Sequence, residues 1–75
     1  MTPHATTLRD LPEGASATIT HTEGVDASLL RAMGLREGVQ VTVRQAGEPV
    51  IVEAGLARLG VASSVSAAVC VTPTG

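Results

Sequence analysis

The clearest predicted strand of this 75-residue chain is the stretch VQVTVRQ, residues 39–45. Its three valines alternate with polar residues, and this period of two predicts a strand with one buried face. Ala46-Gly47-Glu48 follows as a hairpin loop, in which glycine can adopt a positive φ. The chain then returns as a partner strand over residues 49–54, with Pro49 at the first position, where a missing N–H costs least.

Two further elements are predicted before this hairpin. Residues 8–14 carry two leucines three positions apart and then proline and glycine, which indicates one helical or 3₁₀ turn closed by a tight turn. Residues 15–22 alternate between apolar and polar side chains, which predicts a half-buried strand. His21 falls on its apolar phase, as a partly exposed residue near the strand end.

The hydrophobic period becomes helical over residues 25–33. Val25, Leu29 and Met33 lie four positions apart and Leu30 widens the stripe, as on the apolar face of a short amphipathic helix. We expect Leu29 and Met33 to pack in the core. A helix of about two turns is not stable alone, so it must dock on the sheet.

Both ends of this helix carry capping signals. Asp26 is the expected N-cap, because its carboxylate can accept hydrogen bonds from unpaired backbone N–H groups. Gly34 follows the last periodic residue, where a left-handed backbone is cheap only for glycine. Met33, Gly34 and Gly38 are therefore expected to be structural residues of the turn that leads to the central hairpin.

Shorter elements are predicted after the hairpin. Gly55 ends the second hairpin strand, and residues 58–62 form a fourth strand, in which Gly60 suggests a bulge or a close backbone approach. Residues 63–67 are expected as a turn or short helical crossing, and residues 69–71 as a last strand. Five short strands with glycine and proline between them indicate a small barrel or sandwich.

The composition excludes several functions. The chain has no aromatic residue and a net charge of −2, with five arginines and no lysine. It therefore lacks the basic cluster and stacking platforms used to bind nucleic acids, and the aromatic groove used to bind proline-rich peptides. The single cysteine, Cys70, cannot form an internal disulfide. We expect no signal peptide, because the first residues lack a basic region followed by an apolar stretch, and no membrane span, because no apolar run is long enough. A cytoplasmic protein is expected.

The order of the motifs resembles the FeoA family, small proteins of bacterial ferrous iron uptake. A segment with Leu8, Asp10, Leu11 and Gly14 is followed by Met-Gly-Leu-Arg-Glu-Gly over residues 33–38, and then by the Val-x-Val-x-Val strand. The resemblance covers about residues 6–72. Arg31 is the only basic residue in the helix before Met-Gly-Leu, where many members carry several.

The resemblance implies a fold and a partner. The fold is a mainly all-β, five-stranded SH3-like barrel with one short α-helix between strands 1 and 2, within a single domain over residues 1–75. The function is that of an accessory protein that binds the cytoplasmic portion of the membrane permease FeoB. The residues expected at the rim of the helix as a docking surface are Leu30, Arg31, Leu35 and Arg36.

No catalytic or metal site is expected. The soft or borderline ligands available to a transition metal are Met1, His4, His21, Met33 and Cys70. They have none of the spacings typical of a metal site, and Cys70 has no neighbouring base in the sequence to activate it as a nucleophile. We therefore predict no enzyme and no cofactor. Alternatives left open are an SH3-like regulatory module of a metal-dependent repressor system, direct transition-metal binding, and weak homodimerisation.

Overall fold

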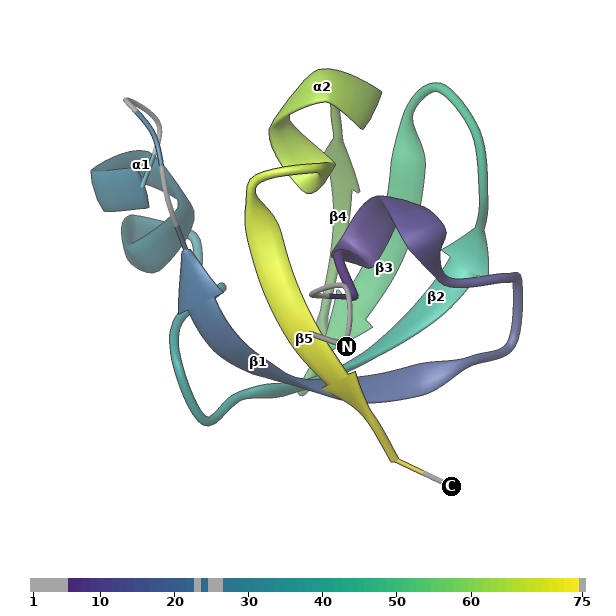
Figure 1. Ribbon diagram of the computed structural model, residues 1–75, viewed down its shortest axis with the longest axis horizontal. Helices are drawn as coiled ribbons and strands as arrows, with labels where there is room; N and C mark the ends of the chain where they lie inside the picture. Colours follow the sequence, from purple (N-terminus) through teal and green to yellow (C-terminus); the bar gives the residue numbers. More distant parts are fainter. Residues whose placement is uncertain (1–5, 23, 25–26, 75) are drawn as a thin grey trace, which may run out of the picture.

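The computed structural model describes residues 6–22, 24 and 27–74 of the chain. Five strands and three short helical segments follow one another in it (Figure 1). In chain order these are the 3₁₀ helix η1 (Leu8–Asp10), β1 (Ser16–Thr22), α1 (Ala27–Ala32), β2 (Gln40–Gln45), β3 (Val50–Ala54), β4 (Ala57–Val61), α2 (Ser63–Ser66) and β5 (Val69–Pro73). The predicted N-cap Asp26, the helix residue Val25 and the tail residue His4 lie outside the described residues.

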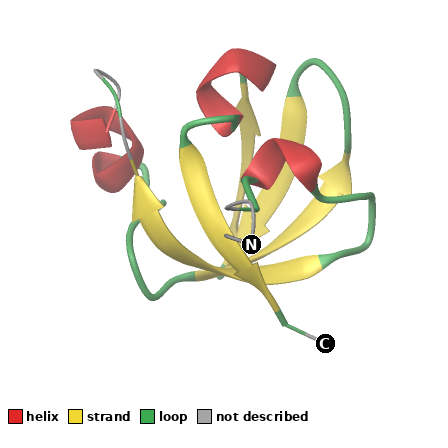
Figure 2. Ribbon diagram, in the orientation of Figure 1, coloured by secondary structure: helices red, strands yellow, loops and turns green. Residues whose placement is uncertain are grey.

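The strands form one antiparallel sheet in the order β4-β3-β2-β1-β5. β1 joins the two halves, because its beginning pairs with β2 while most of its length pairs with β5. The sheet curls into a barrel, and the helical segments lie in the connections around one end of it (Figure 2). The predicted five-stranded SH3-like barrel is confirmed, with α2 as a second short helix where a turn or helical crossing is predicted.

Aliphatic side chains fill the barrel. Val41 and Val43 of β2 are buried and Val39 packs beside them, so the alternation over residues 39–45 points inward as predicted. The strands β3 and β5 also contribute valines to this core. The buried apolar residues are Leu8, Leu11, Ala17, Ile19, Leu30, Leu35, Val41, Val43, Val50, Val52, Val61, Val69 and Val71.

A β-bulge reverses the phase of β1 near its end. The pairing with β5 shifts between Ile19 and His21, so one extra residue, Thr20, lies in β1. Beyond the bulge Thr22 is buried and His21 is exposed. The prediction that His21 continues the apolar phase of Ala17 and Ile19 is therefore wrong, because one inserted residue moves every later side chain to the other face.

The C-terminus of α1 closes with a Schellman motif. Leu35 N–H donates to Leu30 O at 2.8 Å, and Gly34 N–H donates to Arg31 O at 3.0 Å. Gly34 has a φ of +97°, which confirms its predicted role at the helix end. The motif turns the chain back so that Leu30 and Leu35, on its two sides, both enter the core.

Gly60 does not form the predicted bulge. The pairing of β3 with β4 is regular, and Gly60 lies opposite Ile51. A Cβ at Gly60 would lie 3.5 Å from Ile51 Cδ1, which is ordinary van der Waals contact. The two strands are joined by the two-residue turn Gly55-Leu56, in which Gly55 takes a positive φ of 63° at the first central position.

Candidate protein-docking surface

The predicted docking residues separate into two groups. Leu30 and Leu35 are only 2% and 0% exposed, so the prediction that they lie at the rim of the helix is wrong. The Schellman turn carries both side chains into the barrel, where they pack with the other core residues. Arg31 and Arg36 are exposed, on α1 and on the segment that follows it.

Leu29, and not the predicted Leu30, is the leucine of α1 that lies at the surface. It is 59% exposed, so its predicted place in the core is wrong. Successive residues of a helix point about 100° apart, and a barrel this small leaves space for one side chain of the Leu29-Leu30 pair. The two adjacent leucines in the sequence indicate that one could be exposed, but the hydrophobic period alone does not show which one is buried.

Leu29 and Met33 form one wall of a shallow apolar groove. The opposite wall belongs to the end of β4 and to α2, and the volume of the groove is about 160 Å³. We call this the α1–β4 groove; it is lined by Leu29, Leu30, Met33, Gly60, Val61, Ala62 and Val65. Sequence reasoning misses it, because its walls come from segments about 30 residues apart that only the folded barrel brings together.

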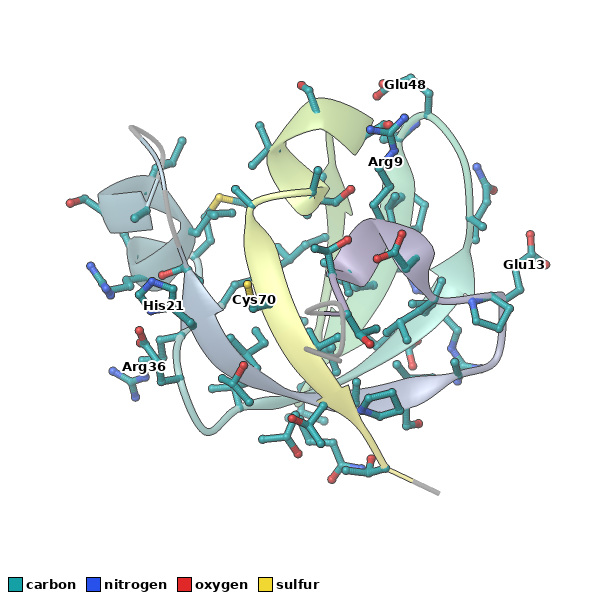
Figure 3. All side chains as sticks on the ribbon, in the orientation of Figure 1. Arg9, Glu13, His21, Arg36, Glu48 and Cys70 are labelled. Atoms are coloured by element: carbon teal, nitrogen blue, oxygen red, sulfur yellow. The ribbon has the colours of Figure 1, made fainter. Side chains whose placement is uncertain are left out.

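Charged groups lie beside this helix. Arg31 lies 3.5 Å from Glu37 Oε2, and His21 Nδ1 lies 3.9 Å from the same oxygen. A hydrogen bond from its own backbone, followed by the hydrogen bond from Arg31, lowers the pKa of Glu37, with a smaller contribution from His21. Within the described residues Arg36 makes no ion pair, and Figure 3 shows it pointing outward on the same side of the molecule as His21.

A second ionic cluster lies on the outer face of β2, β3 and β4. Arg44 Nε lies 2.8 Å from Glu53 Oε1, and Arg58 binds the other carboxylate oxygen at 2.7 Å. The hydrogen bonds from Arg58 and then Arg44 lower the pKa of Glu53. Arg44 and Arg58 each make a cross-strand contact with Glu53 of the neighbouring strand, so both contribute to the stability of the sheet.

Among the described residues, one imidazole and one thiol lie near each other. His21 and Cys70 are cross-strand neighbours in β1 and β5, and Cys70 is half-buried between Val69 and Val71. Across residues 6–22, 24 and 27–74, no three His, Cys, Asp or Glu side chains are close enough together to hold a metal ion.

No helix in the described part of the chain is both long and apolar enough to cross a bilayer.

A five-stranded antiparallel barrel with short helices in its connections defines a small SH3-like domain. The family model of the FeoA domain matches residues 6–73. The chain belongs to the FeoA family, and the resemblance inferred from the motif order is confirmed. This is a family of small SH3-like proteins associated with ferrous iron transport. No curated protein matches the sequence significantly.

Solved structures share this fold. FeoA of Stenotrophomonas maltophilia, in complex with zinc, is 28% identical with a TM-score of 0.81, and the match covers 91% of each chain. An iron uptake regulatory protein, FeoA, is 20% identical with a TM-score of 0.86, over 96% of this chain and 100% of that chain. A manganese-dependent transcriptional repressor is also 20% identical, with a TM-score of 0.81, over 99% of this chain and 44% of its own length. The last two likenesses show a common fold.

Proposed function

We propose that this chain is a cytoplasmic, non-enzymatic accessory protein of bacterial ferrous iron uptake, and that it binds the cytoplasmic portion of the permease FeoB. Membership of the FeoA family supports this proposal. The relative from Stenotrophomonas maltophilia is described as a candidate activating factor of bacterial ferrous iron transport. Docking on the permease would alter its activity or assembly, and iron need not pass through this chain.

The α1 surface carries the proposal. Leu29 is 59% exposed, and Arg31 and Arg36 are exposed on the same helix and on the segment after it. Protein interfaces combine a buried apolar centre with arginines, which bind carboxylates through two parallel hydrogen bonds. We therefore expect an acidic residue on the permease to meet Arg36, and an apolar residue to cover Leu29.

A titration with the isolated cytoplasmic portion of the cognate permease tests this proposal. We expect Arg36→Glu and Leu29→Asn to weaken binding at least tenfold, because each removes an exposed contact. Arg9→Glu is the matched control: Arg9 is exposed on η1 and, in the part of the chain that the structure describes, is not ion-paired. Figure 3 places Arg9 on the far side of the barrel from Arg36.

Each result of this titration has its own interpretation. Unchanged melting temperatures for all three variants would show that the fold is intact, since these positions are exposed. Absence of binding by the unmodified chain would overturn the partner. Equal weakening by Arg9→Glu and Arg36→Glu would show that net charge, and not the α1 surface, determines the affinity.

A further inference from the structure

The two edges of the sheet differ in how they are covered. On the β5 edge, Val71 N–H donates to Thr6 O at 2.8 Å, and Thr7 forms a bridge with Cys70. At the other edge, β4 pairs with β3 alone among the described residues. An uncovered edge is a template on which another strand can add.

The register shows which groups of β4 are available. Ala54 and Ala57 close a two-residue turn, so they form a hydrogen-bonded pair. Such pairs alternate along antiparallel strands, which makes Leu59 and Val61 the other residues bonded to β3. The N–H and C=O groups of Arg58 and Gly60 therefore point away from β3, toward the open edge.

β4 lacks the features that normally block such an edge. Its pairing with β3 has no bulge, and it contains no proline. Arg58 is its one charged residue, and that side chain is held 2.7 Å from Glu53 of the neighbouring strand. Gly60 has no side chain to hinder an approaching backbone. The position of Arg58 is therefore the main electrostatic constraint on an added strand.

β4 has an exposed apolar side chain near its beginning and an apolar groove at its end. At its beginning, Leu56 projects from the β3–β4 turn with its side chain fully exposed. At its end, Gly60, Val61 and Ala62 form one wall of the α1–β4 groove. The other wall of this groove is α1, which therefore lies next to the end of β4.

We propose that the free edge of β4 binds a second copy of the chain, with the two β4 strands antiparallel about a two-fold axis at Leu59. In this register Arg58 lies opposite Gly60 of the partner subunit, so the outward-pointing backbone groups of both strands pair. Leu56 lies opposite Ala62 of the partner subunit and enters its α1–β4 groove. This arrangement pairs the free edge of β4 and also buries the exposed Leu56 in the groove.

Charge repulsion and the filling of both grooves favour this register over the one with its two-fold axis at Arg58. An axis at Arg58 would place the two Arg58 side chains directly opposite each other, which is unfavourable. An axis at Leu59 sets each Arg58 against a glycine and fills both grooves, so the assembly closes as a dimer. The interface is small, one strand edge and one leucine from each copy, and contacts below standard size are weak, so we expect the dimer to form only at high protein concentration.

Sedimentation equilibrium of the full chain over a range of concentrations tests the dimer. We expect a monomer–dimer equilibrium, and Leu56→Asp should weaken it at least tenfold by placing a carboxylate in the apolar groove. Thr72→Asp is the matched control, since it places the same carboxylate at an exposed position on β5. A monomer at millimolar concentration, or equal weakening by both variants, would overturn the proposal.

Amide hydrogen exchange locates the interface independently. The Arg58 and Gly60 amides should exchange at least tenfold more slowly as the dimer forms, while the Leu59 amide, already bonded to β3, stays unchanged as an internal control. Protection of β5 amides instead would place the dimer at the other edge and refute the register. Protection that requires the cytoplasmic portion of the permease, and not concentration, would assign the edge to that partner.

This dimer does not depend on the proposed function. Leu29 lines the α1–β4 groove and also belongs to the proposed permease-binding surface, so the dimer covers part of that surface. Loss of permease binding in Arg36→Glu with an unchanged dimer would separate the two contacts. Loss of the dimer in Leu56→Asp leaves the permease proposal intact.

Discussion

Gly34 offers a direct test of how α1 ends. It occupies the C′ position of the Schellman motif with a φ of +97°. A Cβ built at Gly34 meets no heavy atom within 4 Å, so substitution by alanine introduces no steric clash. The whole cost is therefore the left-handed backbone, which for an L-residue is about 1–2 kcal/mol.

The unfolded state offsets part of this cost. Alanine restricts the unfolded chain more than glycine does, which stabilises the folded state by about 0.4–1 kcal/mol. The net destabilisation of Gly34→Ala is about 1 kcal/mol, which lowers the melting temperature of a domain of this size by about 4–8 °C. Gly34→Val should lower the melting temperature further, because a β-branched side chain tolerates positive φ least.

Gly60→Ala is the matched control for this measurement. Gly60 lies outside the positive-φ region, and its Cβ would make only an ordinary contact with Ile51. We expect an unchanged or slightly raised melting temperature, by thermal denaturation at low protein concentration. If Gly34→Ala melts with the unmodified chain or with Gly60→Ala, the left-handed backbone at position 34 costs an alanine nothing, and glycine is not needed to end α1.

Three further predictions concern the core and the N-terminal turn. Val41→Ala should cost about 1–3 kcal/mol in urea denaturation because Val41 is buried in β2; a loss below about 0.5 kcal/mol, in the range of surface substitutions, would show that Val41 is not buried in solution. Thr22→Val should be neutral or stabilising, since the Thr22 hydroxyl is buried and has no hydrogen bond within the described residues; clear destabilisation in the same assay would mean that the hydroxyl has a partner in solution. Asp10→Asn should lower the melting temperature at neutral pH. The Asp10 carboxylate accepts hydrogen bonds from Thr7 N–H and Oγ1 at 3.0 Å each, which lower the pKa of Asp10 below 3.8. The stability from this pair is present above pH 3.8 and lost as the pH falls through the lowered pKa, so the two melting curves should converge in acid.

Local signals predict much of this fold. The alternation over residues 39–45 places Val41 and Val43 in the core, and Gly47 stands in the loop that follows. Gly34 marks the end of α1 because a left-handed residue there favours glycine over every other type. These features depend on neighbours a few residues away, so the sequence alone contains the information.

The candidate site is predicted only in part. Arg31 and Arg36 are exposed as expected, whereas Leu30 and Leu35 are buried and Leu29 is exposed. The sequence shows an apolar stripe on α1, but the rotation of a two-turn helix is set by the barrel wall against which it packs. The phase of His21 is missed for a related reason, because the bulge in β1 is visible only in the pairing with β5.

The amino-acid sequence is enough to predict the set of strands, the helix end at Gly34, and the absence of aromatic and basic surfaces that would bind proline-rich peptides or nucleic acids. Those properties are local or compositional. The folded barrel is needed to show which leucine of α1 faces solvent, where the α1–β4 groove opens, and which sheet edge is unpaired among the described residues. Each of these depends on contacts between distant segments, and those contacts exist only once the barrel has closed.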